Sequence, residues 1–230
     1  MSTIILYVDL ETTGLEPEGG NILEVAWRYE IDGVRYWHTQ SMVVRLPSLC
    51  REDFDSEYVW SMHRDNGLVA LCSGGAFNHT LAEIETIILE DLQMIEERFG
   101  PHDKVMLGGN SVSFDKSWIQ EHMHELYKRV HYRIFDVRTL ITFFELCGVD
   151  VKSPKIAHRA KDDLKESMRI VDLFRAVVAA PAEDIRKRNE IAEVMFTSFD
   201  QPFAMGAREW RAVADYVMGL LDLERRNAKV

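Results

Sequence analysis

A short apolar run near the N-terminus ends in two acidic residues, and this feature constrains the fold more than any other. Residues 4–8 read Ile-Ile-Leu-Tyr-Val, which is typical of a buried strand. Asp9 and Glu11 follow, and side chains two residues apart on a strand point to the same face. Two like charges in a partly buried place repel each other unless a cation lies between them. Taken alone, the motif fits a metal-binding strand end and an exposed acidic strand end equally well.

The remaining pattern predicts an α/β fold. The Asp32-Gly33 pair between two strand-like runs is a strong signal for a hairpin. Thr80 is expected to cap an amphipathic helix that ends near Phe99. Hairpin strands followed by alternating helices and strands predict a mixed sheet flanked by helices. The other expected strands span residues 22–30, 34–46, 104–107 and 134–135, and the other expected helices span residues 115–130, 137–146 and 160–178, with short helices within 53–76.

Pro181 interrupts the chain after the last of these helices. Two further helical stretches are expected after it, at residues 182–196 and 207–226. We therefore predict a domain of residues 1–180, followed by a C-terminal helical extension of residues 181–230.

The composition excludes several classes of protein. Three cysteines, widely spaced and odd in number, favour reduced thiols over a disulfide framework or a zinc site. No apolar stretch approaches the roughly 18 residues that a membrane span needs. The N-terminus has no basic segment followed by a cleavable apolar stretch, so we expect a cytoplasmic protein.

Three more residues join the acidic pair as candidates for a site. Asp115 is expected near the start of a helix, after a glycine-containing turn. His158 and Asp163 lie at the opening of another helix. A histidine beside a carboxylate cluster is suited to act as the general base that activates a water. Alone, His158 would more often be a capping or surface residue, so its interpretation depends on these neighbours.

The five residues resemble a known signature. In order and local spacing, they match the motif of the DEDDh exonucleases of the ribonuclease-H-like superfamily, whose spacing selects Asp163 rather than Asp162 as the final carboxylate. Over roughly residues 3–176 the chain is most similar to the oligoribonucleases of that family. The segments that carry this likeness are Gly109-Asn110-Ser111, residues 131–137, residues 162–167, and Trp60 with His63 and residues 66–68.

The resemblance implies a fold, a reaction and a cofactor. It implies a ribonuclease-H-like sheet and a 3'→5' exonuclease that hydrolyses short single-stranded RNA to nucleoside 5'-monophosphates. Two divalent cations, Mg²⁺ or Mn²⁺, would lie about 3.5–4 Å apart. They would be held by Asp9, Glu11, Asp115 and Asp163, with His158 as the general base.

The resemblance also implies contacts with the substrate. Leu15 would pack against the terminal bases, although ordinary core packing is the alternative for a leucine. Tyr132 would act in the active site of a partner subunit, which implies a homodimer; a purely structural role for Tyr132 and Arg133 is the alternative. The implied substrate-binding residues are Thr12, Leu15, Trp60, His63, Asn110, Ser111, Tyr132, Arg133 and Thr139.

Two positions depart from the oligoribonuclease pattern. Thr12 stands where these enzymes carry Met, so the segment Glu-Thr-Thr-Gly resembles proofreading exonucleases. Arg138 replaces a small hydroxyl residue before Thr139. These departures keep a single-stranded DNA exonuclease of the proofreading or repair type open as an alternative. An inactive nuclease fold used as a binding module would require the loss of a signature residue, and none is lost.

The net charge of −11 bears on substrate length. Proteins that track long nucleic acids gain affinity by neutralising many phosphates with Lys and Arg, and this chain lacks that surplus. We therefore expect the substrate to be short.

Overall fold

The computed structural model describes residues 3–74, 78–102, 104–147, 149–151 and 158–178. The chain divides into two compact units, which we describe separately: Met1–Val137 with Pro154–Ser167, and Arg138–Ser153 with Met168–Val230. The strands are β1 (Ile4–Thr12), β2 (Ile22–Ile31), β3 (Val34–Val43), β4 (Val105–Gly109) and β5 (Val130–Asp136). The helices are η1 (Arg51–Asp53), α1 (Glu57–Asp65), α2 (Leu68–Gly74), α3 (Leu81–Phe99), α4 (Ser113–His122), α5 (His124–Arg129), α6 (Val137–Leu146) and α7 (Ala160–Val178).

The sheet of the first unit is mixed, as the sequence predicts. Its strand order is β3-β2-β1-β4-β5. β1 pairs antiparallel with β2 and parallel with β4, and therefore lies at the centre. The hairpin between β2 and β3 turns at Asp32 (φ 49°) and Gly33 (φ 84°). Two consecutive residues with positive φ fit the turn that matches the twist of adjoining strands.

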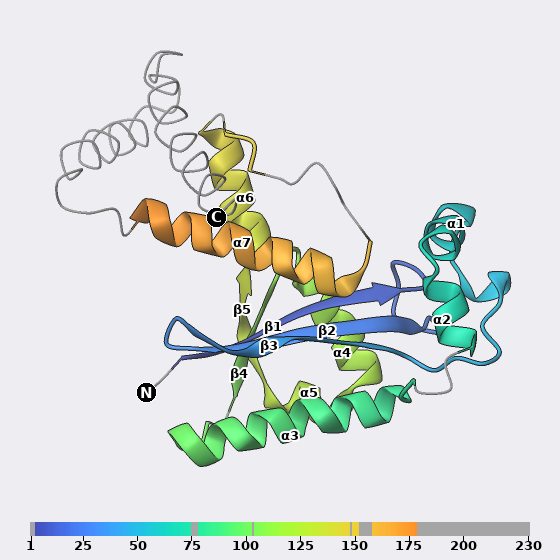
Figure 1. The fold of residues 1–230 in the computed structure, drawn as a ribbon, viewed down its shortest axis with the longest axis horizontal. Coiled ribbons are helices and arrows are strands. Elements are labelled where there is room, and N and C mark those ends of the chain that lie inside the picture. Colours follow the sequence, from blue (N-terminus) through green and yellow to red (C-terminus); the bar gives the residue numbers. More distant parts are fainter. Residues whose placement is uncertain (1–2, 75–77, 103, 148, 152–157, 179–230) are drawn as a thin grey trace, which may run out of the picture. The chain divides into compact units, whose positions relative to one another are not determined.

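Helix α3 covers one face of this sheet (Figure 1). Thr80 and Glu83 form a reciprocal capping box at its start, which confirms the predicted cap. Trp27 Nε1 donates to Asp91 Oδ2 at 2.9 Å, and the Tyr29 hydroxyl donates to the Ile88 carbonyl at 2.9 Å. The core on this side combines alternate residues of the strands with one stripe of the helix: Leu6, Val8, Leu10, Val25, Trp27, Tyr29, Ile84, Ile88 and Leu92. By strand alternation, the residues between them point to the opposite face.

The helix expected over residues 115–130 is two helices, so that prediction was wrong in detail. Met123 leaves helical geometry (φ −130°, ψ 67°) and ends α4. The Glu85 carboxylate accepts a hydrogen bond from the Leu126 N–H at 2.9 Å, which replaces one helical partner. Since Met123 and Leu126 are both fully buried, tertiary packing overrides a continuous helix. Residues 130–133, expected as helix end or loop, belong to β5, and β3 ends at Val43 instead of continuing to residue 46.

The second unit contains most of α6 and the later turns of α7. Phe144 and Phe174 meet edge to face, with ring centroids 6.2 Å apart. Arg138 donates to Glu145 at 3.1 Å across two turns of α6. The predicted helices of residues 182–196 and 207–226 lie outside the described residues, so the C-terminal extension stays a prediction.

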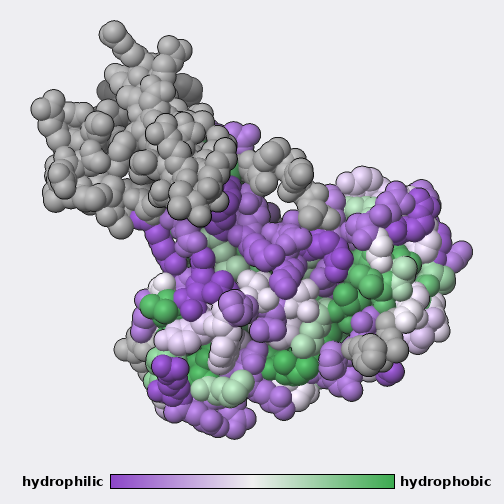
Figure 2. Space-filling model, viewed as in Figure 1, coloured by the Kyte–Doolittle hydropathy of each residue, from purple (hydrophilic) through white to green (hydrophobic). Residues whose placement is uncertain are grey.

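Within the described ranges, no helix combines the length and the apolar character required to cross a bilayer. On the face seen in Figure 2, hydrophilic side chains cover much of the described surface, with hydrophobic residues interspersed among them. The expected cytoplasmic location stays a prediction.

Candidate active site

Asp9 and Glu11 lie on the face of the sheet opposite α3. Their neighbours Val8 and Leu10 belong to the core under α3, so alternation turns both carboxylates the other way. Glu11 is buried and Asp9 is partly buried. The sequence prediction that these two side chains share one face is therefore confirmed.

Asp163 completes a cluster with this pair. It lies in the first turn of α7, where its N–H donates to the Arg159 carbonyl at 3.1 Å. Asp9, Glu11 and Asp163 each offer one carboxylate oxygen, and these oxygens lie within 4.8 Å of one another. Three carboxylates from distant parts of the sequence thus meet at one point. Mg²⁺ and Mn²⁺ prefer such an all-oxygen set of ligands.

Asp115 lies beside the cluster and joins α4 to β1. Its Oδ1 accepts a hydrogen bond from the Leu10 N–H at 2.9 Å, between the two acidic residues of the strand. Asp115 is 4% exposed. It is also the largest electrostatic influence on Asp9 after burial. The structure therefore brings the fourth predicted carboxylate next to the other three, but the oxygens that meet within 4.8 Å belong to the other three.

The protonation of these groups reflects their crowding. Burial, and then the Asp115 carboxylate, raises the pKa of Asp9 well above its usual range. Burial, and then Asp163, raises the pKa of Glu11 to about 8. Burial raises the pKa of Asp115 to about 7, although the Leu10 N–H acts in the opposite direction. Without a cation the cluster therefore holds protons near neutral pH, and a bound cation would displace them. This behaviour fits a metal site.

His158 lies just before α7 and has a left-handed backbone conformation with φ 47°. Asn66, which ends α1, donates from Nδ2 to the His158 carbonyl at 2.7 Å. Burial raises the pKa of Asp163, and the charge of His158 is the first influence that lowers it. His158 therefore lies close enough to the carboxylate cluster to act on it electrostatically, as its sequence position predicts.

Glu24 is a buried residue of this site that the sequence interpretation missed. It is 1% exposed and pairs with Glu11 across β1 and β2. Its carboxylate accepts hydrogen bonds from Arg159 Nε at 2.8 Å and Nη2 at 3.1 Å. A single glutamate within the apolar run Ile22 to Ala26 was the available signal, because a charge there needs a buried partner.

His63 is also buried rather than open to solvent. It is 1% exposed, and its Nε2 lies 3.7 Å from Glu11 Oε2. Burial lowers the pKa of His63 to about 4, so its imidazole is neutral at pH 7. Trp60 packs edge to face on Phe54, with ring centroids 5.1 Å apart. The structure thus places His63 at the carboxylates and Trp60 in a small neighbouring core.

Leu15 is 74% exposed, which excludes ordinary core packing as the reason for a leucine at this position. Asp55 Oδ2 accepts a hydrogen bond from the Leu15 N–H at 2.7 Å and fixes the loop after β1. The Thr12 hydroxyl donates to the Gly14 carbonyl at 2.7 Å inside the same turn. Thr12 is therefore engaged in shaping the loop that presents Leu15.

The other predicted substrate contacts are mainly exposed. Ser111 has φ 55° and its N–H donates to Asp136 at 2.9 Å, while the neighbouring Asn110 is exposed. Tyr132 is 72% exposed, and the Arg133 guanidinium lies 5.3 Å from the centre of its ring. Thr139 belongs to the second unit, where it is exposed on α6.

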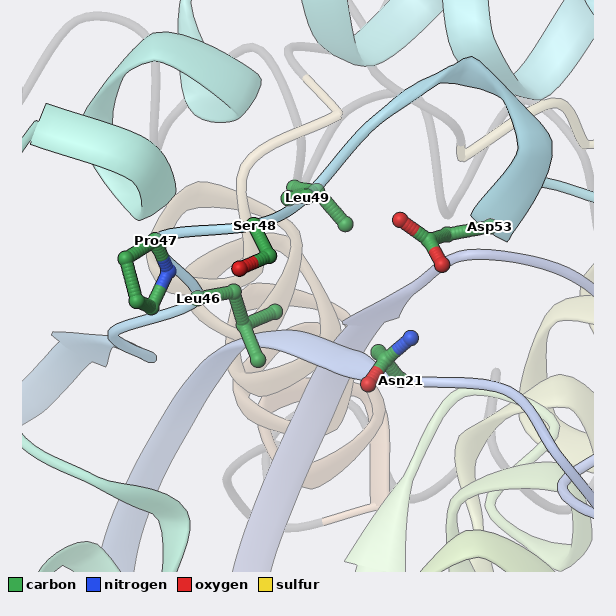
Figure 3. Close-up of a pocket in the computed structure, with 6 residues that line it drawn as sticks. All are labelled: Asn21, Leu46, Pro47, Ser48, Leu49 and Asp53. Carbon is green, nitrogen blue, oxygen red and sulfur yellow. The ribbon is translucent and has the colours of Figure 1, made fainter.

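A separate pocket of about 180 Å³ lies beside the start of β2 (Figure 3). Its lining joins polar and apolar side chains, and it contains none of the predicted site residues. The lining residues are Asn21, Leu46, Pro47, Ser48, Leu49 and Asp53.

Comparison with known proteins places the chain in a family. No family model matches it. A protein of Drosophila melanogaster described as a probable oligoribonuclease is 31% identical over 188 residues, which cover 76% of this chain and 82% of that protein. The oligoribonuclease of Corynebacterium glutamicum is 31% identical over 74% of this chain and 78% of its own length. This chain belongs to the oligoribonuclease family.

The mitochondrial oligoribonuclease of Mus musculus is 30% identical and covers 83% of this chain and 80% of its own length. Family membership confirms the resemblance to oligoribonucleases that the sequence indicates. It also makes this oligoribonuclease-family chain a nuclease, and hence a hydrolase.

A solved structure of Escherichia coli exonuclease I in complex with a dT13 oligonucleotide has a similar fold. The TM-score is 0.53 at 12% identity, and the match covers 82% of this chain but only 43% of exonuclease I. This likeness confirms the ribonuclease-H-like fold of the oligoribonuclease-family chain.

Proposed function

We propose that the protein is a metal-dependent 3'→5' exonuclease that hydrolyses short single-stranded RNA to nucleoside 5'-monophosphates. The observation that carries this proposal is the meeting of Asp9, Glu11 and Asp163 within 4.8 Å, in a chain of the oligoribonuclease family. His158 beside them supplies the group that such a hydrolysis needs in addition.

The carboxylates would hold two divalent cations, Mg²⁺ or Mn²⁺. Asp9, Glu11 and Asp163 would contact them, with Asp115 as the fourth acidic residue beside Asp9. Four carboxylates balance the charge of two dications, so a substrate phosphate can approach the site. When bound, the cations lower the pKa of the attacking water and stabilise the leaving 3'-oxygen.

The remaining steps belong to side chains of this protein. His158 accepts a proton from the attacking water as the water oxygen bonds to phosphorus and the P–O bond to the 3'-oxygen breaks; the leaving 3'-oxygen takes a proton from solvent. Neutral His63 fills the space behind Glu11 without adding charge to it. Exposed Leu15 packs against the terminal bases and aligns the last phosphodiester with the carboxylates.

The test is hydrolysis of 5'-labelled RNA and DNA oligomers of two to twenty nucleotides with Mg²⁺ or Mn²⁺. We expect the highest kcat/KM for the shortest RNAs and the release of nucleoside 5'-monophosphates from the 3' end. A kcat/KM that stays constant or rises with length would refute the preference for short RNA. Faster hydrolysis of DNA than of RNA would instead favour a proofreading-type enzyme.

We also propose that the active protein is a homodimer in which Tyr132 reaches the partner's substrate. Its 72% exposure and its contact with Arg133 support this role, because they leave the ring available at the surface. Mixing Tyr132→Ala protein with Asp9→Asn protein should restore up to about a quarter of the wild-type activity. After random exchange about half of the dimers contain one subunit of each kind, and one of the two sites in such a dimer is intact. No restoration after subunit exchange, or a monomer by light scattering, would refute the dimer.

A further inference from the structure

The segment that carries His158 and Asp163 is held to the sheet by a charged pair between partly buried Arg159 and fully buried Glu24. Arg159 donates from Nε to Glu24 Oε2 at 2.8 Å and from Nη2 to Oε1 at 3.1 Å. The Ala160 N–H donates to Glu24 Oε2 at 3.2 Å. Such a paired contact fixes direction as well as distance. Glu24 thereby orients both the side chain and the backbone of the residues that follow His158.

Glu24 is itself immobilised. It is 1% exposed on β2, which pairs with β1 on one side and β3 on the other. The Ser41 hydroxyl of β3 donates to Glu24 Oε1 at 2.6 Å. The start of α7 is therefore fastened to the interior of the sheet rather than to a surface loop.

His158 needs such support because of its backbone. A residue with a β-carbon rarely adopts φ 47°, and it persists there only where its surroundings hold it. Asn66 holds the His158 carbonyl on one side, while Glu24 holds Arg159 and Ala160 on the other. Asn66 is fixed in turn, because its Oδ1 accepts the Leu68 N–H at 3.0 Å.

We propose that Glu24 is a positioning residue of the reaction, which keeps His158 beside the carboxylates by holding Arg159 and the Ala160 N–H. This inference rests on the proposed function, in which His158 is the general base. Glu24 is not one of the three residues whose carboxylate oxygens meet, although its charge helps to raise the pKa of each of them. The positioning role assigned to it acts through the two residues after His158.

The same strand offers a matched control. Glu30 is also 1% exposed on β2, and its Oε2 lies 3.6 Å from Arg35 Nε on β3. It faces the same side of the sheet as Glu24 but lies near the hairpin, far along the strand from the carboxylates. Each substitution removes a buried carboxylate that is paired with a partly buried arginine, so the two variants separate positioning from general loss of stability.

The kinetic experiment compares Glu24→Gln with Glu30→Gln. We expect Glu24→Gln to lower kcat about 10–100-fold with little change in KM, because a displaced base slows the chemical step. Glu30→Gln should keep kcat within about twofold of wild type. In a His158→Ala background, Glu24→Gln should cost no more than about twofold, since its effect passes through His158. If kcat of the double variant falls by the product of the two single-variant losses, Glu24 acts independently of His158 and the proposal is overturned.

A second readout needs neither substrate nor cation. In the cation-free protein, amide hydrogens of residues 158–165 should exchange about tenfold faster in Glu24→Gln than in wild type or Glu30→Gln. Unchanged exchange there would also overturn the proposal. If Glu24→Gln does not fold, Arg159→Gln tests the same contacts from the exposed side. Absence of RNA hydrolysis by the wild-type protein would refute the proposed function, whereas the exchange result tests the positioning contacts on their own.

Discussion

At the scale of single residues, the candidate site combines groups whose chemistry is set by their surroundings. His158 and His63 are both histidines near the carboxylates, but they differ in position. His63 is buried behind Glu11 and is neutral at pH 7 because burial lowers its pKa to about 4. His158 is only partly buried and lies just before α7, the helix that carries Asp163. Of these two histidines, partly exposed His158 is the one that fits the proposed role of general base.

Replacement of His158 by Ala tests this assignment. We expect kcat to fall by about 10²–10⁴-fold, the usual contribution of a general base. Cation affinity, measured by calorimetry with Mn²⁺, should remain. His102→Ala is a suitable control, because His102 lies after α3 and its Nδ1 contacts the Gly100 carbonyl. A variant that loses cation affinity but keeps kcat at saturating metal would make His158 a ligand instead.

The raised pKa of Glu11 predicts a pH dependence of stability. Folding raises this pKa from its ordinary value of 4.5 to about 8, so the folded, cation-free protein binds the proton more tightly than the unfolded chain. This contribution to stability is complete below about pH 4.5 and is lost as the pH rises through 8. Cation-free Glu11→Gln should therefore have the higher Tm at pH 8.5, with the difference shrinking towards pH 5.

Calorimetric scans in a chelator, repeated with saturating Mn²⁺, measure this effect. The cation should reverse the order, because wild type gains ligand-binding free energy that the variant lacks. Equal Tm values for the two proteins at pH 8.5 in chelator would contradict the predicted crowding of carboxylates.

At the scale of elements, the loop after β1 packs so closely against Asp55 that residue 14 has no room for a side chain. A β-carbon added at Gly14 would lie 1.7 Å from Asp55 Oδ2, the oxygen that accepts the Leu15 N–H. Gly14→Ala should therefore displace Asp55 and release Leu15. We expect kcat/KM for short RNA to fall about tenfold or more, since misplaced substrate contacts slow the reaction.

Asp55→Ala provides the comparison for this loop. It removes the same hydrogen bond without adding a β-carbon at residue 14. The two substitutions should give similar losses of kcat/KM, and their combination should be far from additive. A Gly14→Ala protein with wild-type kinetics would show that the loop tolerates the displacement.

Elements with strong periodic or turn signals could be predicted from the sequence. The hairpin at Asp32-Gly33 and the capped helix α3 are determined by local residues, and both appear where expected. The break at Met123 could not be predicted, because it depends on burial against residues distant in the sequence and on Glu85. Similarly, Asp9, Glu11, Asp115 and Asp163 follow a recognisable spacing, whereas the contacts of Glu24 with Arg159 and Ala160 depend on the fold.

At the scale of the whole molecule, the net charge of −11 predicts how binding responds to salt. Each phosphate neutralised on a single strand contributes about 0.7 to the slope of log affinity against log salt. A site that binds one or two phosphates should therefore give a slope of log kcat/KM against log salt of about −1, whatever the length of the RNA. Measurements between low and physiological salt, with di- and decanucleotides, provide the test. A slope that steepens with length would reveal a phosphate-tracking groove.

The distance along the chain between the carboxylates of the cluster has a consequence for when the site forms during synthesis. β1 brings Asp9 and Glu11 from the beginning of the chain, whereas Asp163 arrives with α7, after the sheet strands have been made. Closing so long a segment is slow compared with forming a hairpin or a helix. Until residue 163 has been synthesised, a growing chain lacks the third carboxylate and cannot assemble the cluster. The cluster therefore forms late in synthesis, because the carboxylates that meet in it are encoded more than a hundred codons apart.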